Sequence, residues 1–162
     1  MTCGDDNKIF EFSIKDKKLV KQGKVWTQEM NKGKAYSTEK IKSTASTLSQ
    51  TPVHQQARGI TYSARHNHVA VSNNYGDVAI LDYNDFSKRI TTLMKPREWC
   101  EVMVYSPNHE WLAVGSHDDT IYIYKISETG EYTHHWTIAF VHSSAILGMD
   151  WTRDSKYLRA VD

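Results

Sequence analysis

The chain has 162 residues, and its 40% hydrophobic and 24% charged content is typical of one globular domain with its own core. Its formal net charge is +1, which by itself predicts no polyanionic partner such as nucleic acid. No apolar run approaches the length of a membrane helix, and the start, MTCGDDNKIF, carries acids and no apolar signal region. We therefore expect neither a membrane span nor a secretory signal.

The first predicted elements are two strands, at 7–13 and 18–26, which read as the last two strands of a four-stranded unit. A long irregular segment follows at 27–56. It is rich in Ser, Thr and Lys and nearly free of large apolar residues, so we expect a surface loop. Its front half is basic because of four lysines: Lys32, Lys34, Lys40 and Lys42.

Charge is distributed unevenly along the chain. Residues 1–42 carry a net charge of +4, and residues 43–162 carry −3. The N-terminal third is therefore the candidate for contact with an acidic surface. Alternatively, the lysines of this N-terminal third only keep strand faces and a loop soluble and have no binding role.

Two longer units follow, each with four short runs of alternating apolar residues. The first unit has runs at 58–63, 68–72, 77–82 and 88–94. The second has runs at 99–105, 110–115, 120–126 and 132–140. Turn signals such as NNYGD, SPNHE and SETGE separate the runs. The end of the chain, AILGMDWTRDSKYLRAV at 145–161, reads as two further strands.

These units are copies of one repeat. LAVGSHDDTIYIYK (112–125) matches VAVSNNYGDVAILD (69–82) at an offset of 43 residues, and MTCGDDNKIFEFS (1–13) matches both. Four strands in about 40 residues, repeated, are typical of a β-propeller blade. We predict an all-β propeller whose strands resemble WD repeats, present as an incomplete arc of two full four-stranded blades flanked by two half-blades. The predicted divisions are a partial blade at 1–26, a loop at 27–56, full blades at 57–95 and 96–141, and a partial blade at 142–162.

The triplet His117-Asp118-Asp119 raises the alternative of a metal-dependent hydrolase. The other copies of the repeat have different residue types at the equivalent positions. A set of metal ligands is not expected at a position of the repeat where other copies have other residue types. Asp, Asn and Gly share the property of forming tight turns. We therefore favour a hairpin turn, and we interpret RHNH at 65–68 as a loop in the same way.

Cysteine chemistry is not expected to contribute a site. Only Cys3 and Cys100 are present, without a CxxC pattern, which argues against a disulfide framework and fits a reducing cytosol. Cys100 falls in the alternating run 99–105, so we expect it to be buried in a strand rather than to act as a nucleophile. We expect no cofactor and no metal.

Four stretches resemble the echinoderm microtubule-associated protein-like (EMAP-like) family. They are GDDNKI (4–9), STASTLSQTPVHQQARG (43–59), EWCEVMVYSPNHEWLAVGSHDDTIYIY (98–124) and HSSAILGMDWTRDSKYL (142–158). The resemblance implies part of the second of two tandem propellers in a non-enzymatic protein. It also implies tubulin or microtubules and neighbouring axonemal or cytoskeletal proteins as partners, in the cytoplasm, cytoskeleton or cilium. A scaffold in another protein complex is the alternative.

Within such a blade, His142 is expected to bind a turn aspartate rather than a metal. Ser116 and Asp118 are expected to belong to the same polar network, and Asp6 occupies the same turn column in the first copy. The lysines of the loop, Lys32, Lys34, Lys40 and Lys42, are the candidate contact with the microtubule. We expect no contact with nucleic acid or a membrane.

Overall fold

The computed structural model describes residues 1–25 and 56–162. The predicted loop at 27–56, with its four lysines, therefore lies outside the described residues except for Gln56. No helix that could cross a membrane occurs in the described part of the chain.

Every regular element in the described ranges is a β-strand, and all pairings are antiparallel. The first sheet contains β1 (Thr2–Cys3), β2 (Lys8–Ser13) and β3 (Lys18–Lys24). The second contains β4 (Ala57–Ser63), β5 (His68–Asn73), β6 (Val78–Asp82) and β7 (Arg89–Leu93). The third contains β8 (Val102–Tyr105), β9 (Trp111–Gly115), β10 (Ile121–Ile126) and β11 (Tyr132–Ile138), and the fourth contains β12 (Gly148–Trp151) and β13 (Leu158–Val161).

This arrangement confirms the predicted all-β arc of two full blades flanked by two incomplete ones. The first sheet differs from the prediction, because the short strand β1 pairs with β2 and adds a third strand to the expected two. Cys100 is fully buried as expected, but it lies before β8 rather than inside a strand. The divisions assigned between blades stay a prediction.

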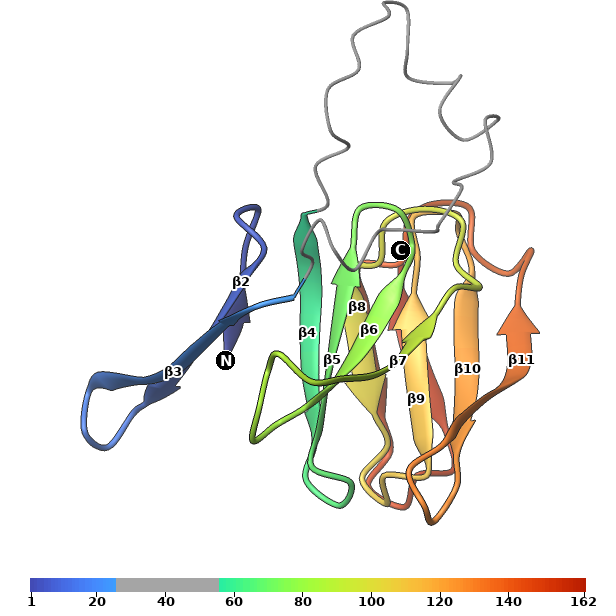
Figure 1. Ribbon diagram of the computed structural model, residues 1–162. Helices are drawn as coiled ribbons and strands as arrows, with labels where there is room; N and C mark the ends of the chain where they lie inside the picture. Colours follow the sequence, from blue (N-terminus) through green and yellow to red (C-terminus); the bar gives the residue numbers. More distant parts are fainter. Residues whose placement is uncertain (26–55) are drawn as a thin grey trace, which may run out of the picture.

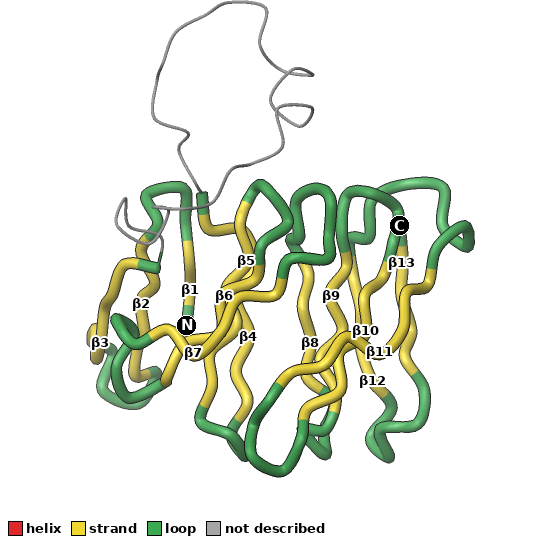
Figure 2. Tube along the Cα trace, turned by 45° about the vertical axis from the view of Figure 1, so that its right-hand side comes forward, coloured by secondary structure: helices red, strands yellow, loops and turns green. Residues whose placement is uncertain are grey.

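The sheets stand side by side with their first strands along the inner side of the arc (Figures 1 and 2). Among the described residues, β4 contacts both β1 and β8, and β8 contacts β12. Within the second and third sheets the strands follow chain order, so β7 and β11 are the outer strands. A meander of this kind gives each sheet one inner edge, one outer edge and two faces.

Alternating side chains bury both faces of the second sheet. Val69 and Val71 belong to the apolar cluster shared with the first sheet, and both are fully buried. Ala70, the residue between them, belongs instead to the cluster shared with the third sheet. Ile121 and Ile123 of the third sheet pack in the same way against the fourth. The period of two residues along a strand produces this division directly.

The turn between β5 and β6 depends on a glycine. Gly76 has φ +81°, a left-handed conformation that a side chain disfavours. A Cβ atom there would lie 2.5 Å from the Pro96 carbonyl oxygen and 2.8 Å from that of Glu98. Asn73 closes the same turn, because its side-chain oxygen accepts hydrogen bonds from the backbone N–H of Tyr75 and Asp77, both at 2.9 Å.

We predict that Gly76→Ala lowers the free energy of unfolding by about 1–3 kcal/mol, because the new methyl group meets backbone atoms in a strained conformation. Gly4→Ala is the matched control, since its nearest neighbour is an Asp6 oxygen at 3.6 Å. Denaturant unfolding of both variants measures the difference. Equal stability of the two variants would contradict the role assigned to Gly76.

Candidate interaction site

The turns at one end of the arc share a repeated geometry. Asn67, His109 and Ser155 occupy the turns that join the first two strands of the second, third and fourth sheets. All three have positive φ, at 56°, 59° and 60°. The turns of His109 and Ser155 are closed by backbone hydrogen bonds of 2.8 Å to Ser106 and Thr152. The same local chemistry therefore shapes these loops in successive blades.

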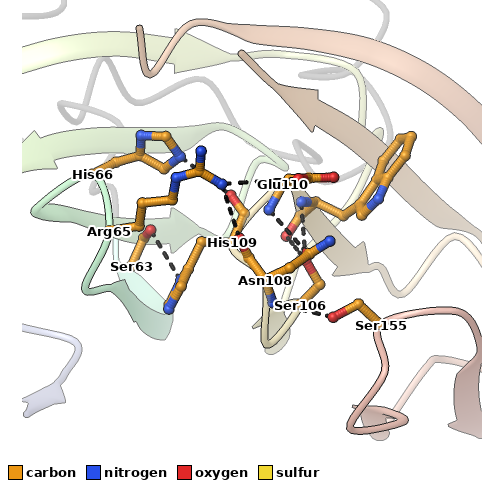
Figure 3. A network of polar contacts seen from close by, with 9 residues as sticks. Ser63, Arg65, His66, Ser106, Asn108, His109, Glu110 and Ser155 are labelled. Atoms are coloured by element: carbon orange, nitrogen blue, oxygen red, sulfur yellow. Dashed lines mark hydrogen bonds and ion pairs between the residues drawn. The ribbon is translucent and has the colours of Figure 1, made fainter. Parts of the chain in front are cut away.

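Polar contacts join these turns across the arc (Figure 3). The Nδ1 atom of His109 lies 3.2 Å from Ser63 Oγ, and the His109 carbonyl oxygen lies 3.3 Å from His66 Nε2. The Asn108 backbone N–H donates to Ser155 Oγ at 3.1 Å, which reaches the fourth sheet. The third sheet is thus connected to both neighbours through one turn.

A charged pair borders the same network. The Nη1 atom of Arg65 lies 3.8 Å from a carboxylate oxygen of Glu110 and donates to the Asn108 carbonyl oxygen at 3.4 Å. Both partners of the ion pair are about half exposed, so solvent screens their attraction. The pair therefore adds little stability and instead places a positive charge next to the histidines.

Burial and neighbouring positive charge disfavour protonation of two histidines in this region. Burial lowers the pKa of His109, and His66 and Arg65 lower it further. Burial also lowers the pKa of His68, with His66 acting in the same direction and Asp82 opposing. His68 Nδ1 lies 3.1 Å from the hydroxyl of Tyr132, which is 2.8 Å from the hydroxyl of Tyr105. These contacts connect β5 with β8 and β11.

A second series of contacts crosses the opposite end of the arc. Arg58 on β4 forms an ion pair with Asp5 at 3.1 Å, and its guanidinium carbon lies 4.4 Å from the ring centre of Trp99. The Trp99 ring is 5.5 Å from that of His117, and His117 Nε2 is 3.3 Å from a Glu101 carboxylate oxygen. Trp99 remains 40% exposed. An exposed Trp beside an Arg is a combination enriched in protein–protein contacts.

The structure brings Ser116 and Asp118 into contact with each other and places His142 in a separate contact. Ser116 Oγ donates to the Glu98 carbonyl oxygen at 3.3 Å and accepts from the Asp118 backbone N–H at 3.3 Å. Asp118 also accepts from the Tyr122 hydroxyl at 2.7 Å. His142, which precedes β12, has its Nδ1 atom 3.6 Å from a carboxylate oxygen of Asp162, the residue directly after β13. A shared role for these residues stays a prediction.

Asp6, the fourth predicted network residue, lies in the first sheet. It accepts a hydrogen bond from the backbone N–H of Lys8 at 3.2 Å and pairs with the Lys8 ammonium at 3.1 Å. These bonds to Lys8 lower the pKa of the Asp6 carboxyl group. Asp6 therefore stabilises the start of β2 in the first sheet, whereas Ser116 and Asp118 follow β9 of the third sheet and His142 precedes β12 of the fourth.

The side chains of His117, Asp118 and Asp119 do not form a ligand set. His117 faces Trp99 and Glu101, whereas Asp118 accepts hydrogen bonds from Tyr122 and from the Arg97 backbone. Within residues 1–25 and 56–162 no group of three His, Cys, Asp or Glu side chains is placed to hold a metal ion. The candidate contact lysines, Lys32, Lys34, Lys40 and Lys42, lie outside these ranges.

Sequence reasoning did not identify the residues that connect neighbouring turns. His109 and Ser155 fall in corresponding turns, and Arg65 and His66 lie in a segment interpreted only as a loop. At the offset of 43 residues that relates the two full units, His66 and His109 fall in one column, which is the signal that could have identified this position. Their contacts across the arc still required the packing of the sheets.

Acidification should destabilise the protein through these histidines. Their pKa values are lower in the folded chain than the ordinary value of about 6.5, so the unfolded chain binds more protons below that pH. The stability they contribute is fully present above pH 6.5 and is lost as the pH falls through the folded pKa. Thermal unfolding between pH 7.5 and 5.5 measures how steeply the stability of the protein falls with pH. His109→Gln should make this dependence on pH weaker. The same dependence in His109→Gln, in His68→Gln and in the parent would contradict the role assigned to these histidines.

We predict that the purified protein contains no stoichiometric divalent metal, because His117 and Asp118 have other partners. His117→Ala should cost about 1 kcal/mol of stability through its lost contact with Trp99. Elemental analysis of parent and variant, with unfolding measurements on both, tests this. Stoichiometric zinc or manganese that disappears in the variant would restore the hydrolase alternative.

The sequence model of the WD domain, G-beta repeat, matches residues 87–125. This range runs from the outer strand of the second sheet through β10 of the third. The match therefore covers one strand of one blade and three strands of the next, all within the described residues.

Among solved structures, a chain of the Mitotic Checkpoint Complex matches 70% of this chain and 34% of its own length, with a TM-score of 0.57 and 18% identity. The Cps50 (Swd1) β-propeller domain of Myceliophteria thermophila matches 72% of this chain and 41% of its own length, with a TM-score of 0.57 and 13% identity. At such identities the likeness establishes the β-propeller fold alone.

Curated relatives match at higher identity. The Ciliary WD repeat-containing protein ctxp80 of Euplotoides octocarinatus is 34% identical over 99% of this chain, which spans 21% of that protein. Human Echinoderm microtubule-associated protein-like 3 is 34% identical over 56% of this chain, which spans 10% of it. The 77 kDa echinoderm microtubule-associated protein of Lytechinus variegatus is 42% identical over 40% of this chain, again 10% of its length. The chain is therefore a WD-repeat segment that is similar to a ciliary WD repeat-containing protein and to EMAP-like proteins, and it spans only a small part of each of these relatives.

Proposed function

We propose that the chain belongs to a non-enzymatic microtubule-associated protein, with tubulin as its partner and the cytoskeleton or cilium as its site of action. The observation that carries this proposal is the similarity, over 99% of the chain, to a ciliary WD repeat-containing protein. Three further relatives are named as echinoderm microtubule-associated proteins or as like them. The resemblance also implies that this arc belongs to the second of two propellers.

The geometry is compatible with this role because the arc is a rigid support. Apolar clusters fill the spaces between adjacent sheets, and polar contacts join the turns at both ends. A rigid support lets surface side chains contact a partner without a large loss of conformational entropy on binding. Exposed residues such as Trp99 then provide contact surface.

We further propose that Lys32, Lys34, Lys40 and Lys42 contribute electrostatic attraction to the microtubule. Tubulin is expected to present acidic surfaces, and each exposed charge contact is worth about 1 kcal/mol or less, so several must act together. Binding should weaken as salt rises, because the Debye length falls to about 8 Å at physiological ionic strength.

Co-sedimentation with microtubules at low and moderate salt tests the proposal. Changing Lys32, Lys34, Lys40 and Lys42 together to Glu should greatly reduce pelleting at low salt. The matched control changes the exposed Lys95, Lys125, Arg153 and Lys156 to Glu, which alters the net charge equally. An equal loss of pelleting in both variants would indicate non-specific electrostatic attraction. Unchanged binding of the variant with Lys32, Lys34, Lys40 and Lys42 changed to Glu would indicate that the contact lies on the propeller faces.

A scaffold in another protein complex is the second candidate, and the WD-repeat match favours it as much as it favours microtubule association. Failure of the unaltered protein to pellet with microtubules at any salt concentration would support this alternative. If only the variant with the four loop lysines changed to Glu failed to pellet, the microtubule proposal would stand and these lysines would be the contact with the microtubule.

A further inference from the structure

The outer side of the first sheet is strongly basic. Residues 8–24 contain six lysines and only two acids, Glu11 and Asp16. The lysines are Lys8, Lys15, Lys17, Lys18, Lys21 and Lys24. They lie on β2, on β3 and in the turn between these strands, so one hairpin carries a net charge of +4.

This hairpin has a free edge at the outside of the arc. The sheet order is β1-β2-β3, so no strand pairs with the outer edge of β3 in the part of the chain that the structure describes. In the repeat, β3 corresponds to the outer strands β7 and β11. Its edge therefore points away from the inner strands and is unpaired within residues 1–25 and 56–162. Figure 1 shows β3 at the far left of the arc.

Most lysines along this edge have no partner of opposite charge. Lys15, Lys17, Lys18 and Lys24 are exposed, and the structure gives them no ion pair with any residue of 1–25 or 56–162. Lys21 donates to the Tyr83 carbonyl oxygen and lies 4.1 Å from the ring centre of Phe86, and Lys8 is the exception that has an acidic partner, Asp6.

Apolar side chains are exposed between the lysines. Ile14, Leu19 and Val20 are 87%, 45% and 57% exposed. An exposed edge strand that combines positive charge with apolar side chains matches an extended segment that alternates acidic and apolar residues.

Two lysines of this sheet also face each other around a hollow. Lys8 and Lys24 are direct partners in the register of β2 and β3, an arrangement in which like charges repel. Together with Gln22 and Gly23 they line a cavity of about 250 Å³. Asp6 neutralises Lys8 at 3.1 Å, whereas Lys24 has no such partner in the described residues. A carboxylate in this cavity would relieve the repulsion.

The lysines are not a general feature of outer strands in this fold. β7 has the sequence RITTL, and its Arg89 donates to the Val25 carbonyl oxygen at 2.7 Å. β11 has the sequence YTHHWTI and contains no lysine. Lysines on an edge can serve to prevent aggregation, but the other two outer edges lack that protection. The concentration of charge on β3 therefore needs a separate explanation.

We infer that β3 is a binding edge for an extended, acidic polypeptide segment. The segment adds to the sheet as a further strand, its backbone hydrogen-bonds to the free edge of β3, and its carboxylates lie beside Lys18 and Lys24. Apolar side chains of the segment cover Leu19 and Val20. The inference names the chemistry of a partner segment and is independent of the proposed association with microtubules.

Fluorescence anisotropy of the full chain with a labelled synthetic peptide tests this inference. The probe alternates glutamate and valine, and its control replaces every glutamate with glutamine. The acidic peptide should bind and the glutamine peptide should not. Lys18→Glu combined with Lys24→Glu should weaken binding about tenfold or more, since each exposed charge contact contributes up to about 1 kcal/mol. The double change to Gln should have an intermediate effect.

The matched control is Lys95→Glu combined with Lys156→Glu, which changes net charge equally on exposed lysines away from β3. Equal weakening by this control would overturn the inference, as would equal binding of the glutamine peptide or no binding at all. A peptide with alternate amides N-methylated should lose affinity; unchanged affinity would rule out addition as a strand. Tighter binding of a single-stranded oligonucleotide, with the same dependence on Lys18 and Lys24, would also overturn the inference.

Discussion

Burial of both faces of each central sheet against its neighbours is the constraint on which the rest of the structure depends. A single sheet of this size would leave one or both apolar faces in water, and burying them is the main favourable contribution to its folding. Val69 and Ala70 are adjacent in sequence and belong to different apolar clusters. A blade therefore has no complete core of its own, and its stability depends on the blades beside it.

This packing determines where polar groups meet. Once apolar clusters hold the sheets side by side, the turns at each end come within hydrogen-bonding distance. His109 then reaches Ser63 and His66, and at the other end Arg58 reaches both Asp5 and Trp99. These contacts are individually modest, but they fix how adjacent blades are aligned. They also make the alignment of the blades sensitive to pH, because burial lowers the pKa of His109 and disfavours its protonated form.

Charged residues do not follow the repeat that the apolar residues follow. The apolar repeat is similar in all blades, whereas the lysines are concentrated in the first sheet and the acids lie largely in the remaining ones. A repeated scaffold with one distinct surface is well suited to recognition, since the surface can vary while the core stays the same. This separation also explains why the fold is shared with structures of low identity such as the Cps50 (Swd1) propeller domain. Likeness in the core carries no information about the partner.

The sequence by itself determined the class of fold, the repeat and most strands, because alternation of apolar residues and turn-forming residues are local signals. It also indicated that His117 and Asp118 belong to a turn. It did not show β1, which is too short to have a pattern, nor that Cys100 lies outside a strand. Only the tertiary structure decided that His109 bridges two sheets, that Trp99 stacks on Arg58, and that Lys8 and Lys24 face each other across a hollow. Such contacts depend on the register and spacing of strands, and no pattern within one segment specifies which residue of another segment it will meet.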